Sequence, residues 1–319
     1  MVRTVFLLAA ALVLPAQAQA AISECAESQV ATPLVSGVLV EEVSSDIPDF
    51  KMLRVSARRG AFMHIYFDPQ SEAIARQYSA CLGTQLNLLA AELLDDREAA
   101  QWYSVIFTSD QDYVPSKSAG VKARWIISTN PPAPRSSTPQ AMVLETIPHE
   151  QVHDYQTRNR TKLPLWVLEG HATWVGLSIT TILDPKIGQS KREETFSRVD
   201  LTAVPAKLAE WGDRRPKREA MLRQVSPEDR AKMEADPAYV PNVPFRFTLD
   251  DFESDESRTL ERYAASLLIF EGLERRHGAD KIRQWIAEIT ATSGNVSKDQ
   301  LAASIKLHFG EDLTELIKD

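Results

Sequence analysis

Two of the six histidines in this 319-residue chain, His149 and His153, lie four residues apart in the segment ETIPHEQVHDYQT (145–157), with Glu150 directly after the first. This spacing constrains the fold more than any other feature, because on a helix residues four apart differ by only about 40° around the axis. Two neutral imidazoles placed in this way can both reach one zinc ion. Glu150 lies about 100° round from His149, within reach of a water at the metal. The segment therefore predicts a metal-binding helix suited to hydrolysis.

A candidate third ligand, Glu169, lies in the segment LPLWVLEGHATWVG (163–176). Pro164 suits the first turn of a helix. The short turn RNRTKL (158–163) allows this second helix to run antiparallel to the histidine helix, which would bring Glu169 over the histidine pair. Two histidines and one glutamate leave a fourth position for water, as catalytic zinc sites require.

Two neighbours of Glu169 on the same predicted helix have other expected roles. His171 lies about 200° round the axis from Glu169, so both cannot face one metal ion, and we expect His171 to pack in the interior or to contact substrate. Thr173 lies one turn after Glu169 and shares its face. That position is compatible with a contact to a metal ligand and equally with an ordinary helix surface.

Residues 1–20 are predicted to be a secretory signal peptide. Arg3 precedes an apolar run, Val5–Leu14, that is too short to span a membrane, and the small-residue pattern Ala18–Ala20 follows it. No other apolar run in the sequence approaches the length of a membrane span. We therefore expect an exported protein, periplasmic or secreted, without a membrane span.

The charge and the cysteine content limit the classes of partner and site. The chain has 36 basic and 44 acidic residues and a net charge of −8, which argues against a nucleic-acid partner. Two cysteines, Cys25 and Cys81, are too few for a cysteine-based zinc site. In an oxidising compartment they can form one disulfide, but the sequence alone leaves the pairing open.

Segments with strand composition come before segments with helical periodicity. The predicted strands are Ala61–Asp68, Trp102–Ser109 and Ala123–Thr129, with a long amphipathic helix from Ile74 to Leu93 after the first. The later predicted helices are Ala141–Thr157, Pro164–Leu183, Arg258–His277, Ala279–Thr292 and Ser297–His308. Strands followed by helices predict an α+β fold with a mostly helical C-terminal lobe.

The predicted organisation has four parts. After the signal peptide, residues 21–183 form an N-terminal α+β lobe that carries the metal-binding helices. Residues 184–257, rich in Pro, Arg, Lys and Glu, are interpreted as a charged insertion with short helical pieces. Residues 258–319 form a C-terminal helical lobe.

Three segments together resemble a known family. They are HEQVH (149–153), LPLWVLEGHA (163–172) and YAASLLIFEGLERRHG (263–278). They look like the gluzincin metallopeptidases of the thermolysin-like superfamily, with the bacterial peptidase MA-like domains nearest and the aminopeptidase N and leukotriene hydrolase group more distant. The resemblance spans roughly residues 62–289 and implies a thermolysin-like zinc peptidase domain.

The resemblance also implies roles for individual residues. It implies zinc ligands at His149, His153 and Glu169 and a catalytic base at Glu150. Tyr263 matches a catalytic tyrosine that begins a helix in the aminopeptidase and leukotriene hydrolase branch; a tyrosine that packs its ring in the C-terminal lobe is the alternative. The upstream edge strand, here 123–129, would bind the substrate backbone.

Three departures from the family pattern limit what the resemblance implies. Pro148 directly precedes His149 and must begin the helix or kink it. The gap from His153 to Glu169 is about one helical turn shorter than in the aminopeptidase branch. No G-x-M-E-N segment, which holds a free amino terminus in that branch, occurs in the chain. Exopeptidase specificity is therefore not supported.

Other interpretations of the motif remain open. The polar residues can belong to the surface of a structural helix, or the domain can bind zinc without catalysis and act as an exported interaction module. A di-iron carboxylate protein is a further alternative, because Glu274 and His277 repeat the E-x-x-H spacing of Glu150 and His153. Against it, Gly278 signals a helix end, so the second pair is expected to face solvent.

The favoured interpretation is a zinc-dependent peptidase that acts on peptide or protein substrates. Zinc would lower the pKa of a water, and Glu150 would accept its proton and pass it to the leaving nitrogen.

Overall fold

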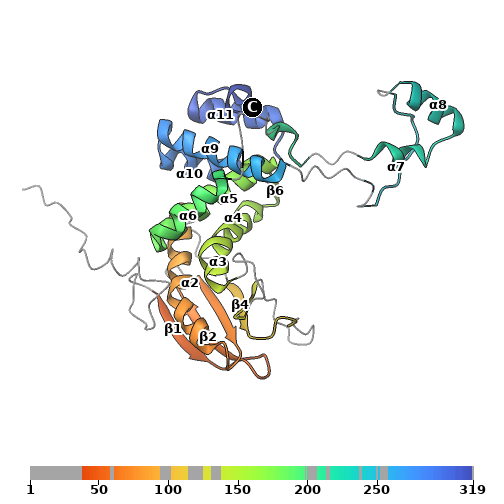
Figure 1. Ribbon diagram of the computed structural model, residues 1–319. Coiled ribbons are helices and arrows are strands. Elements are labelled where there is room, and N and C mark those ends of the chain that lie inside the picture. Colours follow the sequence, from red (N-terminus) through yellow and green to blue (C-terminus); the bar gives the residue numbers. More distant parts are fainter. Residues whose placement is uncertain are drawn as a thin grey trace, which may run out of the picture.

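The first described part of the chain forms a five-stranded sheet, and the chain continues after it almost entirely in helices (Figure 1). This computed structural model describes residues 38–57, 61–93, 102–113, 125–130, 138–197, 199, 207–212, 216–236, 239–248, 251 and 258–317. The predicted signal peptide lies outside these ranges. The predicted α+β class, with N-terminal strands and a mostly helical C-terminal part, is confirmed.

The sheet is mixed and has the strand order β1-β2-β3-β4-β5. Its strands are β1 (Leu39–Val43), β2 (Lys51–Ser56), β3 (Phe62–Phe67), β4 (Trp102–Thr108) and β5 (Trp125–Ser128). The pairs β1–β2 and β2–β3 are antiparallel, whereas β3–β4 and β4–β5 are parallel. Helix α2 (Glu72–Glu92) makes the crossover between the parallel strands β3 and β4. Among the described strands, β5 lies at one edge of the sheet, the position expected for 123–129.

The two faces of the sheet are covered unequally. One face packs into the main hydrophobic core with α2, and alternate residues of β2 and β3 supply its side chains: Leu53, Val55, Met63, Ile65 and Phe67. The other face carries a small cluster of Ile47, Met52, Tyr66 and Ile106. The alternation follows from the pleat, which sends successive side chains to opposite faces.

Cys81 is fully buried on α2 and is disulfide-bonded. The sequence holds one other cysteine, Cys25, which lies outside the described residues.

The predicted strands at 61–68, 102–109 and 123–129 are confirmed as β3, β4 and β5, each slightly shorter than expected. Two further strands, β1 and β2, were not predicted. The reason lies in β2, where the adjacent residues Met52 and Leu53 are both buried, one on each face of the sheet, so that no clean alternation marks the strand. The expectation of helices only after residue 139 was wrong in detail, because the short strands β6 (Thr161–Lys162) and β7 (Gly294–Asn295) pair in parallel.

The predicted long helices are all present. They are α4 (Ile147–Thr157), which continues α3 (Pro139–Ala141) and the π-helical turn η4 (Met142–Thr146), then α5 (Leu165–Leu183), α9 (Thr259–His277), α10 (Ala279–Thr290) and α11 (Lys298–Phe309), with a short α12 (Leu313–Leu316) at the end. Ser297 caps α11 through a reciprocal capping box with Gln300, which explains the sharp start of that helix.

Helix α5 is the central element of the helical part and packs against α4, α6 and α9. A glycine permits the contact with α9, since a Cβ at Gly170 would lie 2.9 Å from ring carbons of the buried Phe270. Close helix approach of this kind requires a residue without a side chain. The helix that carries Glu169 is therefore held on several sides by well-packed neighbours.

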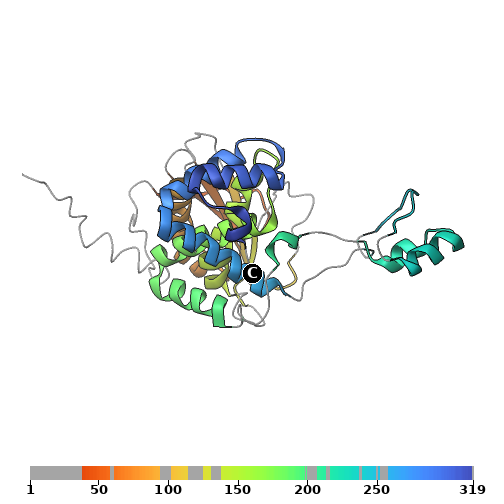
Figure 2. The same cartoon turned by 90° about the horizontal axis from the view of Figure 1, so that it is seen from above.

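The stretch predicted as a charged insertion, 184–257, contains elements of two kinds. Helix α6 (Pro185–Ser197) packs against α5, and the 3-10 turn η5 (Leu208–Glu210) contacts α5 and α9. Helices α7 (Arg218–Leu222) and α8 (Pro227–Ala235) stand away from the main body in both views (Figures 1 and 2). The domain boundaries themselves stay a prediction.

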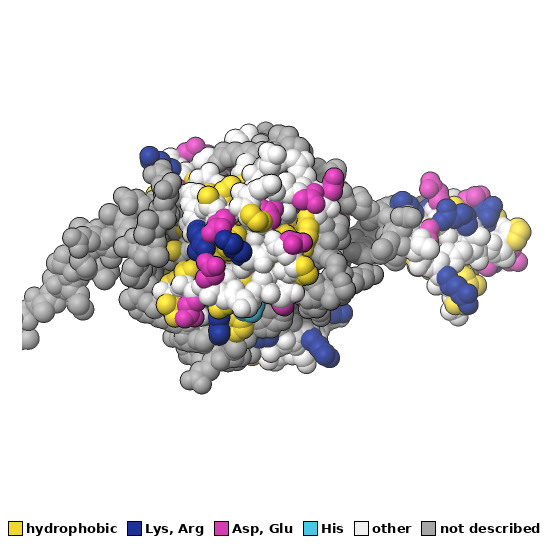
Figure 3. All heavy atoms as spheres, turned by 90° about the horizontal axis from the view of Figure 1, so that it is seen from below, with side chains coloured by type: hydrophobic (Ala, Val, Ile, Leu, Met, Phe, Trp, Pro, Cys, Tyr) yellow, Lys and Arg dark blue, Asp and Glu magenta, His cyan; other side chains and the backbone are white. Residues whose placement is uncertain are grey.

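Charged side chains of both signs are mixed on the surface of the described residues. Figure 3 shows acidic and basic side chains side by side on the projecting α7 and α8 and interspersed on the main body. On α8, for example, Lys232 Nζ lies 2.7 Å from a Glu228 carboxylate oxygen. Within the described ranges, no helix combines the length and the apolar character that a membrane crossing requires.

Candidate metal centre

A π-helical turn leads into the histidine helix and accommodates Pro148. In η4 the Ile147 N–H donates to the carbonyl of Met142, five residues earlier. Pro148 has no N–H to donate, so carbonyls in the preceding turn need other partners. The Gln85 side chain donates to the carbonyl of Val143, and the Thr180 hydroxyl donates to that of Leu144. Pro148 is thus the second residue of α4 in a continuous helical run.

Helices α4 and α5 run antiparallel, as the short connection between them predicted. The start of α4 lies beside the later part of α5, where a Cβ at Gly176 would be 3.2 Å from the backbone N and Cα of His149. The end of α4 lies beside the beginning of α5, where Gln156 Nε2 donates to the carbonyl of Leu168 at 3.0 Å. The two contacts fix the register in which Glu169 faces the histidines.

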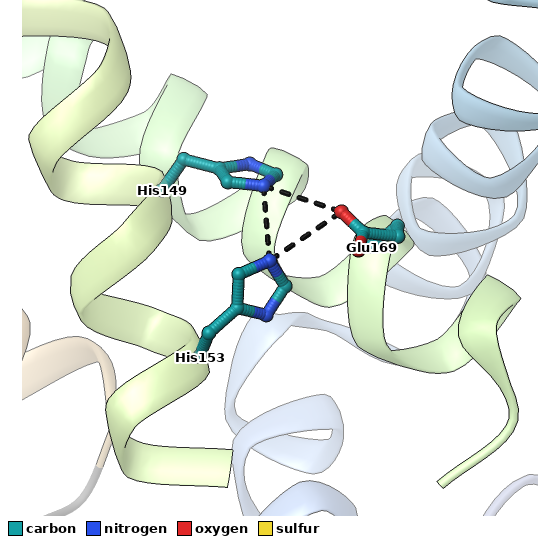
Figure 4. Close-up of side chains that lie close together, drawn as sticks. All are labelled: His149, His153 and Glu169. Carbon is teal, nitrogen blue, oxygen red and sulfur yellow. Dashed lines mark hydrogen bonds and ion pairs between the residues drawn. The ribbon is translucent and has the colours of Figure 1, made fainter. Parts of the chain in front are cut away.

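The structure brings His149, His153 and Glu169 together, with the two histidines on α4 and the carboxylate on α5 (Figure 4). His149 Nε2 and His153 Nε2 are 3.1 Å apart, and Glu169 Oε2 lies 3.3 Å from the first and 3.4 Å from the second. One ligand atom from each residue lies within 4.8 Å of the others. All three side chains are partly buried.

The donor set fits one divalent metal ion. Glu169 Oε2 is buried, and within the described residues it has no hydrogen-bond partner despite its proximity to both rings. A buried carboxylate oxygen without such a partner is costly in a protein interior. A zinc ion, which takes imidazole nitrogen and carboxylate oxygen as ligands, would satisfy all three atoms.

A buried glutamine orients one of the rings. Gln156 Oε1 lies 2.8 Å from His153 Nδ1, and Gln156 Nε2 lies 3.0 Å from His171 Nδ1. Burial, with the charge of His153 as a smaller cause, lowers the pKa of His171 to about 3, so its ring is neutral and its Nδ1 can accept a hydrogen bond. The amide then accepts the Nδ1–H of His153. The lone pair of His153 Nε2 is left facing His149 and Glu169.

The charges of Glu169 and His153 favour each other. Burial acts to raise the pKa of Glu169, but the polar contacts with His149, His153 and Tyr263 outweigh it and hold the pKa well below its usual range. Burial likewise acts to lower the pKa of His153, but the contacts with Glu169 and Gln156 outweigh it and raise the pKa. Glu169 is therefore an anion at neutral pH, as a metal ligand must be.

The two residues predicted to be catalytic lie next to the histidines. Glu150 is exposed and lines the same pocket as His149 and Tyr263, with a volume of about 360 Å³. The ring of Tyr263 has its centroid 6.3 Å from that of His149. Burial and the contact with the Glu169 carboxylate raise the pKa of Tyr263 above its usual value, so the hydroxyl keeps its proton. Tyr263 thus faces the candidate metal centre.

The structure places the two remaining sequence candidates, His171 and Thr173, near the site but not among the possible metal ligands. His171 is buried and packs on Trp174 and Phe270, in line with the packing role expected for it. Thr173 lines the pocket, but its hydroxyl has no hydrogen-bond partner among the described residues.

The second E-x-x-H pair is separate from the candidate metal centre. Glu274 accepts a hydrogen bond from the Trp174 indole at 2.8 Å, and His277 pairs with Glu311. Among the described residues, the group of possible metal ligands comprises His149, His153 and Glu169 and does not include this pair. The arrangement therefore does not favour the di-iron alternative.

The sequence did not lead us to predict Gln156 as the hydrogen-bond partner of His153. Gln156 follows His153 by three positions, so the two lie on one face of α4. A polar residue at this spacing was the signal that could have identified it as a partner of the histidine. Its burial could not be recognised, because that depends on how α4 packs against α5.

Replacing Gln156 with methionine is expected to lower the zinc affinity about 10–100-fold, the usual effect of losing the hydrogen-bond partner of a ligating histidine. Methionine keeps most of the volume but offers only a weak sulfur acceptor to the Nδ1–H of His153. Competition with a chelator at fixed pH measures the affinity. Gln151→Met is the matched control, since Gln151 is buried on the same helix and its amide makes no hydrogen bond within the described residues. Equal zinc affinities of the two variants would show that Gln156 does not support His153 as a zinc ligand.

No protein-family model matches the chain, and no curated protein sequence matches it. Solved structures with a similar arrangement of elements include two crystal structures of M1 zinc metallopeptidase from Deinococcus radiodurans. One, a mutant bound to a Tyr-Ser-Ala substrate, aligns over 88% of this chain and 51% of its own, at 10% identity and a TM-score of 0.38. The other aligns over 88% and 50%, at 11% identity and a TM-score of 0.40. This chain therefore spans about half the length of those structures, and similarity at this level assigns no residue a role.

Proposed function

We propose that this chain is a zinc-dependent peptidase of the gluzincin type that hydrolyses peptide bonds in peptide or protein substrates. The observation that carries the proposal is the convergence of His149, His153 and Glu169 within one small region. Two imidazoles and one carboxylate are a ligand set of catalytic zinc sites and leave a fourth position for a reacting group. Glu150, directly after the first ligand, supplies the base that hydrolysis needs.

The protein groups have separate tasks in this proposal. Zinc, when bound, supplies a Lewis acid that polarises the substrate carbonyl and makes water more acidic. The Glu150 carboxylate accepts the proton of the attacking water and delivers it to the leaving nitrogen. The Tyr263 hydroxyl donates a hydrogen bond to the oxyanion that develops on the carbonyl oxygen. Gln156 keeps His153 in the tautomer that directs its Nε2 lone pair towards the metal.

Metal analysis together with a broad peptide-library cleavage assay tests the function. We expect about one zinc per chain and cleavage that disappears after chelation and returns with added zinc. Zinc binding without cleavage of any peptide would favour the alternative of an exported, non-catalytic interaction module. Two iron ions per chain would favour the di-iron alternative instead. A protein that binds no zinc would contradict the proposed function directly.

Removing the Tyr263 hydroxyl is expected to slow the chemical step. Tyr263→Phe keeps the ring that packs against Trp211 but loses the donor, and a donor to the oxyanion contributes about 10²–10³ to kcat. Zinc content and stability should be retained. Tyr239→Phe is the matched control, because its hydroxyl also bonds a carboxylate, that of Asp229 at 2.8 Å, on the projecting segment. An unchanged kcat in Tyr263→Phe, measured with chemistry rate-limiting, would leave the tyrosine a packing role only.

The proposal also includes the compartment in which the protein acts. The N-terminal pattern of Arg3, the apolar run 5–14 and Ala18–Ala20 supports export to the periplasm or the medium. A peptidase in that compartment meets peptides and proteins outside the cytoplasm as its substrates.

A further inference from the structure

The pocket beside the candidate metal centre has charged walls. His149 and Glu150 line it, and helix α6 contributes Lys191 and Glu194. Since Lys191 and Glu194 are three residues apart, they lie on one face of α6. The π-helical turn η4 contributes Glu145. With three carboxylates and one ammonium, the lining carries a net negative charge.

Glu145 is the carboxylate that most needs a cationic partner. Only 10% of its side chain is exposed, whereas the Lys191 side chain is 44% exposed. The two form an ion pair, with Lys191 Nζ 3.2 Å from Glu145 Oε2. A charge that is mostly buried is costly unless it is paired. Because Lys191 is much more exposed than its partner, its ammonium can move into water when another cation takes its place.

An ion pair links the helices around these charges, and the pocket walls are partly aliphatic. Arg192, next to Lys191, makes a bidentate contact with Glu271 of α9, with both N–O distances 2.8 Å, and this ties α6 to α9. Leu177 and Leu260 also line the pocket. Such a wall suits the methylene stem of a long basic side chain, whose charged head prefers a polar surrounding.

We propose that this pocket binds the side chain of a lysine or arginine next to the scissile bond of the substrate. Glu145 and Glu194 bind the cationic head, and Lys191 is the group that the substrate replaces. The assignment rests on the proposed peptidase function, because the pocket opens beside the residues that would perform the hydrolysis. A volume of about 360 Å³ is within the range of ligand pockets.

The test uses peptides that are identical except for arginine, leucine or glutamate at one position, with that position scanned across the cleavage site. For the wild type we expect kcat/KM to be highest for arginine at one position adjacent to the cut bond. Glu145→Gln should lower the arginine-to-leucine ratio about ten- to a hundredfold, as the loss of a hydrogen bond to a charged group predicts. Lys191→Met removes the competing ammonium and should raise the ratio. The control Glu228→Gln, an exposed carboxylate of α8, should keep the wild-type ratio.

Other outcomes contradict the assignment. A wild type without a basic preference, or an arginine-to-leucine ratio that stays unchanged in both Glu145→Gln and Glu194→Gln, would overturn it. A preference for glutamate that Lys191→Met abolishes would also overturn it, because Lys191 would then be the recognising group.

Binding separates this assignment from the proposed function. Calorimetry with the zinc-loaded Glu150→Gln protein reports the affinity for the same peptides without turnover. Tighter binding of the arginine peptide, combined with a wild type that cuts no peptide, would support the pocket assignment and contradict the peptidase. Cleavage without a basic preference would support the peptidase and contradict the pocket assignment.

Discussion

Replacing Glu169 with alanine is expected to remove zinc from the protein. The carboxylate is the third member of a three-ligand set, and it lies 3.3 Å and 3.4 Å from the Nε2 atoms of His149 and His153. Losing only an outer partner of a ligand lowers metal affinity about 10–100-fold, so the loss of the ligand itself should lower it about a hundredfold or more. Metal content after dialysis and chelator competition measure the change.

A second glutamate provides the control and tests an alternative at the same time. Glu274 is the same residue type on a helix, is exposed and bonds the Trp174 indole. Glu274→Ala should retain full zinc binding. Under the di-iron alternative Glu274 would be a ligand, and this variant would lose metal together with the first. Full zinc occupancy in Glu169→Ala would contradict the assignment of the Glu169 carboxylate as a zinc ligand.

Replacing Glu150 with glutamine is expected to separate zinc binding from chemistry. The amide keeps the shape of the side chain but cannot accept a proton, and general base catalysis contributes about 10²–10⁴ to the rate. The variant should therefore bind zinc as the wild type does and lose about that factor in kcat. Single-turnover kinetics with a peptide found in the library assay measure the chemical step.

The control for this variant is Glu288→Gln, at an exposed carboxylate of α10 that pairs with His308. It carries the same change of charge and should retain the wild-type kcat. If Glu150→Gln turned over substrate at the wild-type rate, another group would be the base. A loss of zinc in Glu150→Gln would show instead that the Glu150 carboxylate contributes to zinc binding.

The elements that the sequence predicted well carry strong local signals. Helices α2, α5 and α9 have long runs of apolar residues at helical spacing, and β3 and β4 are short apolar runs with strong strand formers. Strand β1, with Glu41 and Glu42 at its centre, has poor strand propensity and is held by pairing with β2. That support comes from a partner elsewhere in the chain, so local patterns could not indicate it.

In the candidate site, too, features that depend on local spacing were predictable and those that depend on tertiary packing were not. The grouping of His149, His153 and Glu169 was predictable, because one spacing along a helix and one short connection between helices nearly determine it. Lys191 was not predictable as a neighbour of Glu145, since their contact depends on the packing of α6 against α5. Contacts that depend on tertiary packing leave no periodic signal in a single sequence.

The π-helical turn η4 also sets the rotational phase between two parts of the site. A π turn closes from residue i to i+5 and so holds one residue more than the α turn it replaces. Deleting Thr146 would leave Glu145 three instead of four residues before His149 and so change where its carboxylate lies on the helix, while the His149–His153 spacing stayed intact. In evolutionary terms, the carboxylate of the pocket and the ligands of the metal are separately adjustable: a one-residue insertion or deletion between Glu145 and His149 can change selectivity without touching the residues proposed to do the chemistry.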